Sequence, residues 1–232
     1  MSLKRTVQRS EPRKVIGTFL AFFDLRNIHL IEFTMKAFTK HTGLVATMDR
    51  SNVDTDQIIP KQFLKRIERT GFGQYLFFDW RFDEQGNQQP DFELNRPQFK
   101  NASVLVARKN FGNGSSREHA VWALDDFGFR CVIAESFADI FYNNCSKNGV
   151  LPVRLQPEEV ELIHQLVSET DGFRLTIDLE TQTVSDGNAF NASFEIDTYR
   201  RECFLEGLDH IAITLQHLDK IEEFEKLRNL QA

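Results

Sequence analysis

Closely spaced cysteines are absent from this sequence. Its 232 residues include three cysteines, Cys131, Cys145 and Cys203, and no C-x-x-C pair occurs among them. An odd and scattered set is typical of a cytosolic chain with reduced thiols, and it argues against a disulfide framework or a zinc site. Because iron–sulfur clusters usually draw on cysteines that lie close together in a loop, we expect no metal site on this chain.

The sequence also lacks a long apolar run and an excess of positive charge. No apolar run approaches the ~20 residues that a helix needs to span a membrane. The formal net charge is −6, whereas a general nucleic-acid binder needs a basic face that displaces counterions. We therefore expect a cytoplasmic globular protein that binds neither a membrane nor nucleic acid.

Residues 1–34 differ in character from the rest of the chain. A basic start precedes the apolar run 15–23, which superficially resembles a secretory signal, but no small-x-small cleavage site follows. We interpret this segment as an extension upstream of the folded domain and expect it to be poorly ordered or peripheral. Met35 then opens one domain, residues 35–232, since no internal repeat or convincing linker interrupts it.

Apolar strands alternate with helical patterns from residue 43 to residue 170. The predicted strands are 43–48, 103–107, 131–134 and 150–155, and the predicted helices are 61–67, 116–127, 136–147 and 157–170. This alternation indicates an α/β fold with parallel βαβ units. Residues 71–102 are irregular and aromatic, and we expect a long surface excursion close to a substrate or partner.

After residue 172 the pattern changes to period-two alternation. The segments 173–179 and 193–197 flank Asp186-Gly187, which predicts a hairpin or meander with one exposed face. Short helices are predicted at 198–206 and 208–215, and a charged helix at 217–230.

The stretch from Phe111 to Ala120 combines glycines, hydroxyls and charges at a predicted strand-to-helix turn. In one interpretation, Ser115 and Glu118 form an S-x-x-E capping box and the glycines merely allow the turn; taken alone, the short motif favours this. In the other, Gly112 and Gly114 expose backbone amides to an anion at the helix start, and Arg117 grips a carboxylate through two parallel hydrogen bonds.

The motif differs from better-known catalytic turns. Its glycine spacing matches neither the G-x-S-x-G nucleophile elbow, nor a Walker loop, nor a Rossmann fingerprint. We interpret His119, four residues after Ser115, as a satisfied helix-terminal histidine and not as a base. The polar loop 52–57 either lines a site or caps the helix that follows, and its residue types favour neither interpretation.

These residues resemble a known family. The segment 111–119 closely resembles the G-x-G-S-S-R-E-H signature of the swivelling domain of the aconitase superfamily. Within that superfamily, the segments 52–60, 136–141 and 207–211 agree with the 3-isopropylmalate dehydratase small-subunit family. The resemblance covers residues 35–232, so residues 1–34 lie outside it. Asn113 and Val121 depart from residues common in relatives, and we expect neither to alter the chemistry.

The resemblance implies a swivelling β/β/α domain in three layers that pairs with a large subunit carrying a [4Fe–4S] cluster. The pair would interconvert 2-isopropylmalate and 3-isopropylmalate, which are hydroxy-dicarboxylic acids, through isopropylmaleate in leucine biosynthesis. Ser115 matches the base, and Ser116 and Arg117 match substrate-carboxylate contacts. The capping box and the catalytic turn would then be the same segment, in which Gly112, Gly114 and Glu118 have structural roles at the site. Further substrate contacts are expected beside them from the polar loop, at Asp54, Thr55 and Asp56.

Two alternatives stay open at this point. A sister enzyme of the same superfamily would act on a related acid, such as citraconate, maleate or homoaconitate. A module of a different class would bind acids without catalysis and keep the glycine–serine turn only as a capped anion site.

Overall fold

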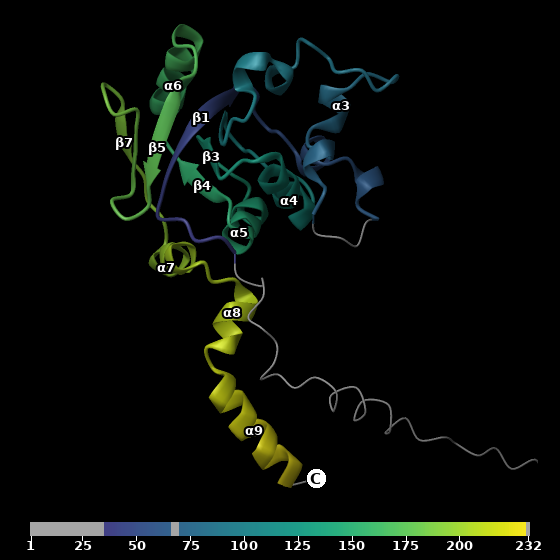
Figure 1. Cartoon of the computed structure of the whole chain (residues 1–232), viewed down its shortest axis with the longest axis vertical. Helices are drawn as coiled ribbons and strands as arrows, with labels where there is room; N and C mark the ends of the chain where they lie inside the picture. Colours follow the sequence, from purple (N-terminus) through teal and green to yellow (C-terminus); the bar gives the residue numbers. More distant parts are fainter. Residues whose placement is uncertain (1–34, 66–69, 231–232) are drawn as a thin grey trace, which may run out of the picture. The chain divides into compact units, whose positions relative to one another are not determined.

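We describe a computed structural model that covers residues 35–65 and 70–230 (Figure 1). The predicted extension, residues 1–34, lies outside the described residues, as does the last part of the helix predicted at 61–67.

The described strands form one seven-stranded sheet in the order β4-β3-β2-β1-β5-β6-β7. Neighbours from β1 to β4 are parallel, whereas β5 pairs antiparallel with β1 and continues into the antiparallel β6 and β7. The strands are β1 (Lys40–Met48), β2 (Val104–Ala107), β3 (Cys131–Ala134), β4 (Leu151–Arg154), β5 (Arg174–Asp178), β6 (Thr183–Ser185) and β7 (Asn191–Ser193).

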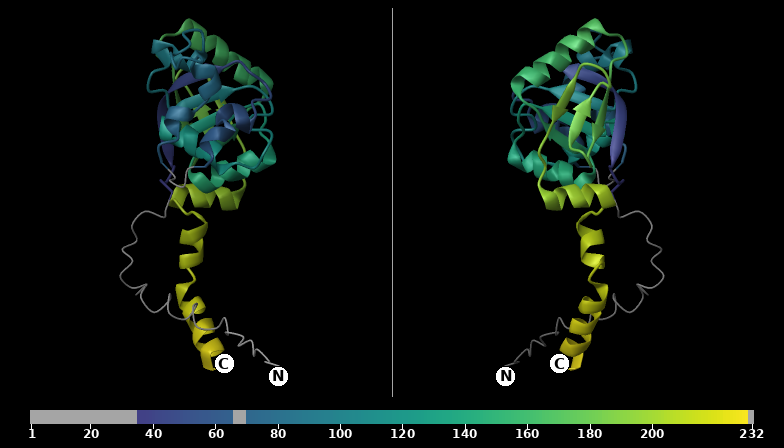
Figure 2. Two further views of the ribbon diagram at one scale, coloured as in Figure 1. Left: turned by 90° about the vertical axis from the view of Figure 1, so that its right-hand side faces the viewer. Right: turned by 90° about the vertical axis from the view of Figure 1, so that its left-hand side faces the viewer.

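The two halves of the sheet follow from two different sequence patterns. All residues of β2 and β3 are buried, as expected for parallel strands covered on both faces. In β5 the buried residues Leu175 and Ile177 alternate with more exposed ones, because one face meets solvent. The hairpin around Asp186-Gly187 forms, but it joins β6 to β7, and the middle strand β6 was not predicted. With β5 these strands make an antiparallel meander at one edge of the sheet (Figure 2, right).

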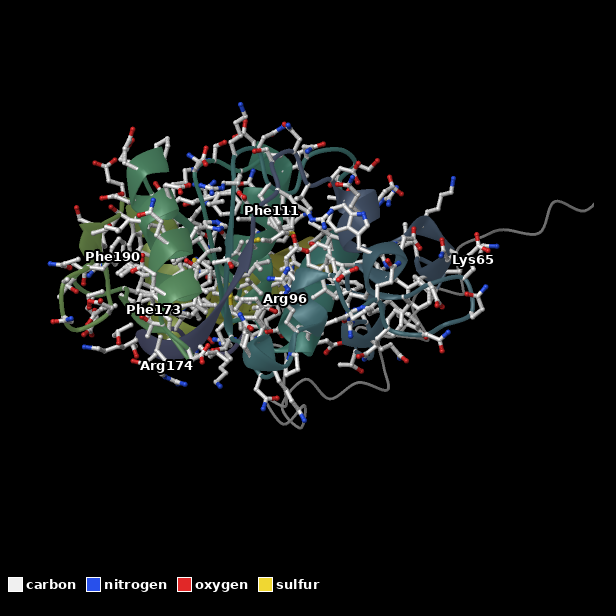
Figure 3. All side chains as sticks on the ribbon, turned by 90° about the horizontal axis from the view of Figure 1, so that it is seen from above. Lys65, Arg96, Phe111, Phe173, Arg174 and Phe190 are labelled. Atoms are coloured by element: carbon white, nitrogen blue, oxygen red, sulfur yellow. The ribbon has the colours of Figure 1, made fainter. Side chains whose placement is uncertain are left out.

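Helices cover both faces of the parallel strands. The helices are α2 (Thr55–Ile58), α3 (Phe78–Arg81), α4 (Glu118–Phe127), α5 (Asp139–Asn148), α6 (Pro157–Glu169), α7 (Thr198–Glu206), α8 (His210–Leu215) and α9 (Leu218–Leu230). Right-handed crossovers that step from β2 to β3 to β4 put α4 and α5 on one face. Helix α6 packs against β1 and β2 from the other face (Figure 3). The predicted α/β class with parallel βαβ units is confirmed.

The excursion 71–102 is irregular, as predicted, and lies over the side of the domain away from the hairpin (Figure 2, left). Its start is fixed to α4, where the Phe72 amide donates to Asp126 Oδ2 at 2.7 Å. Farther along, Glu93 accepts two hydrogen bonds from Arg50, at 3.0 and 3.2 Å, so the excursion is also tied to the loop after β1.

The structure differs from the sequence prediction where the polar loop was expected to lead into a helix at 61–67. The helix forms earlier, as the short α2, and only a 3-10 turn, Lys61–Phe63, follows. Asp54 and Gln57 build a capping box, which starts α2 inside the polar loop. Pro60 is extended, with φ −60° and ψ 142°, and separates the two turns.

The C-terminal helices α7, α8 and α9 were all predicted: α7 has the predicted bounds, α8 starts two residues later than predicted, and α9 starts one residue later. Gly207 ends α7 in a left-handed conformation, as the sequence indicated. Among the helices of the described residues, none combines the length and apolar character needed to cross a membrane.

Candidate active site

The glycine–serine turn lies at the carboxyl ends of the parallel strands. It follows β2, which ends at Ala107, and lies between the loops that follow β1 and β3. Isolated parallel bridges join Asn113 to Asp54 on one side and Phe111 to Phe137 on the other. In open α/β proteins the crevice at these strand ends is the usual place for a ligand.

Backbone hydrogen bonds anchor the first half of the turn. The Gly112 amide donates to the Val53 carbonyl at 2.7 Å. Phe111 exchanges hydrogen bonds with the loop after β3, donating to the Ser136 carbonyl and accepting from the Ala138 amide, each at 3.0 Å. Phe111 is fully buried in the middle of the domain (Figure 3). The turn is therefore built on the core at this end.

The two glycines of the turn have different reasons for being glycine. Both have left-handed φ angles, +76° at Gly112 and +95° at Gly114. A Cβ on Gly112 would collide with three ring carbons of Phe141, Cγ, Cδ1 and Cδ2, so the ring leaves no space for a side chain. A Cβ on Gly114 would meet nothing closer than Thr55 Oγ1, at 3.4 Å. Sequence reasoning gave Phe141 no role, although it lies in one of the matching segments.

Ser115 and Ser116 are exposed at the open side of the turn. Within the part of the chain that the structure describes, the amides of Gly114, Ser115 and Ser116 donate no hydrogen bond, and neither does Ser115 Oγ. Helix α4 starts at Glu118, and its N-terminus adds roughly half a unit of positive charge beside these donors. The arrangement offers an anion several unpaired donors in one place.

The predicted capping box between Ser115 and Glu118 is not formed. Arg117 is the N-cap of α4, without a side-chain capping bond, and Glu118 is its first residue. The box needs the serine at the N-cap and the glutamate three residues later, but here the helix starts two residues too late. The Ser115 carbonyl instead accepts a hydrogen bond from outside the helix, from the Thr55 hydroxyl.

Arg117 and Asp56, both predicted site residues, form a two-pronged ion pair. Arg117 Nη1 donates to Asp56 Oδ1 at 2.6 Å and Nη2 to Oδ2 at 3.0 Å. The Arg117 side chain is 15% exposed and that of Asp56 is 52% exposed. The guanidinium is therefore held at the edge of the open side in the geometry with which arginine binds a carboxylate.

The other two predicted residues of the polar loop have structural contacts. Asp54 accepts from the Gln57 amide at 2.8 Å as the N-cap of α2. Thr55 is 2% exposed, and its hydroxyl donates to the Ser115 carbonyl at 3.0 Å. The Thr55 side chain therefore lies buried beneath the turn, with its hydroxyl directed at the backbone of Ser115. The loop thus both caps a helix and supports the site.

His119 packs among aromatic rings, 4.6 Å from the centroid of Trp122 and 5.3 Å from that of Phe72. Partial burial has the largest effect on the pKa of the His119 imidazole, and it lowers that pKa. The packing agrees with the interpretation of His119 as a structural residue.

The cysteines do not fit an iron–sulfur cluster. All three are buried, on β3, α5 and α7, and burial raises the pKa of the Cys131 and Cys145 thiols. A cluster needs thiolates, which such surroundings disfavour. Across residues 35–65 and 70–230, no group of three or more His, Cys, Asp or Glu side chains could hold a metal ion.

Known proteins with the same features share both sequence and fold with this chain. Residues 35–158 match the aconitase C-terminal domain family, and residues 162–198 match LeuD_N. The 3-isopropylmalate dehydratase small subunit of Rhodopirellula baltica is 65% identical over 195 residues, which are 84% of this chain and 100% of the relative. That of Koribacter versatilis is 59% identical over 192 residues, 83% of this chain and 98% of the relative.

A solved structure agrees with these relatives. The 3-isopropylmalate dehydratase of Methanocaldococcus jannaschii superposes with a TM-score of 0.60 at 27% identity, over 80% of this chain and 99% of that one. The sheet, with its glycine–serine turn at the carboxyl edge, thus defines a domain of the aconitase C-terminal type. Within that class, the chain belongs to the 3-isopropylmalate dehydratase small-subunit family. The family and fold predicted from the motifs are confirmed.

Proposed function

We propose that this chain supplies the base and the carboxylate-binding groups of a hydro-lyase that interconverts 2-isopropylmalate and 3-isopropylmalate through isopropylmaleate. Family membership supports the reaction class. The observation that carries the residue roles is the exposed Ser115 at the start of α4, surrounded by amides without partners.

In this proposal, Ser115 Oγ removes the proton from the carbon next to a substrate carboxylate. A serine hydroxyl is a weak base in water, so its alkoxide must be stabilised before it can act. Donors fixed in advance stabilise developing negative charge without reorganisation. The free amides of Gly114 and Ser116 and the N-terminus of α4 are donors of this kind.

Arg117 and Ser116 bind the substrate carboxylate. The Asp56 carboxylate already binds the guanidinium of Arg117. A substrate carboxylate would bind the guanidinium at this position or next to it. Because Asp56 and the substrate carry the same charge, Asp56 acts on Arg117 and does not contact the substrate carboxylate directly. It keeps the guanidinium extended in a binding geometry until the substrate arrives.

The remaining parts of the enzyme are assigned to a large-subunit partner. The names of the relatives specify a small subunit, which implies a second, larger chain. We place the [4Fe–4S] cluster on that chain, because the buried cysteines here do not fit it. Ser115 and Ser116 are exposed on this chain alone, so the partner would also close the site against water.

The test is to co-purify the chain with the large subunit, reconstitute the cluster and follow isopropylmaleate by its absorbance. Ser115→Ala should lower kcat by about 10²–10⁴-fold, the contribution of a positioned base, with pairing unchanged. Ser193→Ala, an exposed serine on β7, is the matched control. An unchanged rate for Ser115→Ala would remove Ser115 as the base. If the wild-type pair converts neither isopropylmalate isomer but hydrates a related unsaturated acid, the substrate assignment is wrong.

A further inference from the structure

Thr55 holds the catalytic turn from below by two hydrogen bonds. Its amide donates to the Asn113 carbonyl at 2.8 Å and its hydroxyl to the Ser115 carbonyl at 3.0 Å. These acceptors lie on either side of Gly114, which has a left-handed φ of +95°. The Thr55 side chain is buried, although buried threonine is uncommon, so its hydroxyl has a specific partner and no solvent.

The direction of the Ser115 carbonyl decides the direction of the next amide. A peptide unit is planar, and in the trans form its C=O and N–H point in opposite directions. The described part of the chain contains no cis peptide bond. Because Thr55 holds the Ser115 carbonyl on the inner side, the Ser116 N–H faces outward, and it donates to no group of residues 35–65 or 70–230.

We propose that Thr55 is a positioning residue for the reaction, acting through the peptide plane between Ser115 and Ser116. Its hydroxyl fixes that plane, and so fixes both the base Oγ and the outward amide that stabilises it. The inference rests on the proposed role of Ser115.

In the described part of the chain, the Thr55 hydroxyl makes the only hydrogen bond to this peptide, and the next contact after it is the ion pair of Arg117 with Asp56. Gly112 is fixed by the Val53 carbonyl and the Phe141 ring, but both act three residues before Ser115. Beyond them, Gly114 makes little contact that would resist rotation, since a Cβ there would have ordinary space. Removal of the Thr55 hydroxyl therefore frees the peptide that carries the base while the rest of the turn stays anchored.

The experiment compares two pairs of variants in the holoenzyme, each pair differing by a hydroxyl. Wild type and Thr55→Val both carry a branched side chain, and Thr55→Ser and Thr55→Ala both lack the γ-methyl of threonine. A misplacement of about 1 Å costs roughly 10²-fold in rate. We expect kcat to fall by about that factor in Thr55→Val, with the Michaelis constant within about twofold, and Thr55→Ser to exceed Thr55→Ala by a similar factor.

A pH profile separates positioning from general loss of structure. The ascending limb of kcat/KM reports the deprotonation of the base. When the outward amide no longer supports the alkoxide, this limb should move to higher pH in Thr55→Val. Thr42→Val removes another threonine hydrogen bond, the 2.8 Å contact with Thr176 on the hairpin side, and should shift neither kcat nor the profile. If Thr55→Val does not pair with the large subunit, the comparison of Thr55→Ser with Thr55→Ala decides the question.

The possible failures are distinct. Suppose first that Ser115→Ala is inactive. The positioning role of Thr55 is then overturned if Thr55→Val keeps the wild-type kcat, or if Thr55→Ser and Thr55→Ala are equally active. Full activity of Ser115→Ala instead overturns the proposed function itself, and with it the basis of the inference.

Discussion

Gly112→Ala tests whether the catalytic turn is pressed against the core. A left-handed φ costs a residue with a Cβ roughly 1–2 kcal/mol. The new methyl would also lie within 2.5 Å of Phe141 Cδ1 and Cδ2 on a fully buried ring. Overpacking of this kind typically costs about 1–3 kcal/mol. The free energy of unfolding should therefore fall by about 2–5 kcal/mol, the sum of these two contributions.

Two further glycines separate the backbone contribution from the steric one. Gly187 has φ +78°, nearly the same as Gly112, but a Cβ there would meet no atom within 4 Å. Gly187→Ala should thus show only the backbone cost, roughly 1–2 kcal/mol. Gly114→Ala, with its closest neighbour at 3.4 Å, should behave like Gly187→Ala in stability. Gly112→Ala and Gly114→Ala, which lie in the turn, should change the turnover rate, whereas Gly187→Ala should turn over like wild type.

The assay is thermal unfolding followed by circular dichroism, together with turnover by the reconstituted pair. In a chain of this size, 1 kcal/mol lowers the melting temperature by roughly 2–4 °C, so Gly112→Ala should melt about 4–20 °C below wild type. If Gly112→Ala and Gly187→Ala melt together, the Phe141 ring yields without cost and the tight contact plays no part in holding the turn.

The remaining predictions concern charge. Arg117→Lys keeps the cation but loses the fork that Asp56 engages, so the Michaelis constant for isopropylmalate should rise by about 10–100-fold, as for the loss of a hydrogen bond to a charged group. Arg154→Lys, half-exposed at the end of β4, is the control, and a similar rise there would contradict a specific role for the fork. Burial and then Arg108 lower the pKa of His164, whose Nε2 is buried without a hydrogen-bond partner. In the unfolded chain His164 has its ordinary pKa of about 6.5, so it takes up a proton at a higher pH than in the folded protein. Its contribution to the free energy of unfolding is therefore present above about pH 6.5 and is lost as the pH falls below that value. His164→Gln should flatten the dependence of the unfolding free energy on pH between 7.5 and 5.5 in urea titrations, and an unchanged slope would refute this.

The fold was predictable where local pattern and tertiary environment agree. Strands β2 and β3 are continuous apolar runs because both of their faces are covered, and the same apolar runs identified them in the sequence. Gly128 ended the predicted helix and ends α4 with φ +115°. The hairpin followed from period-two alternation on a sheet with one exposed face.

The local rules failed where a distant residue competes for a backbone group. The S-x-x-E spacing of Ser115 and Glu118 satisfies the capping-box pattern, but Thr55, sixty residues earlier, takes the Ser115 carbonyl. Similarly, Asp54 and Gln57 start a helix within the polar loop, where the apolar spacing had suggested a later one. The first outcome is not readable from a window of neighbouring residues, because it depends on which loops lie side by side. The second rests on a local capping box between Asp54 and Gln57, which the search for apolar spacing overlooked.

The sequence by itself determined the family, the α/β class and the identity of the turn that carries Ser115 and Arg117, since these depend on residue types at fixed spacing. Only the tertiary structure decided what each residue of the polar loop does. Crossing from β1 to β2 brings this loop beside the turn, where Asp56 meets Arg117 and Thr55 lies beneath Ser115. Burial then separates them: the exposed Asp56 meets the fork at the open side, and the buried Thr55 has only the backbone to bind.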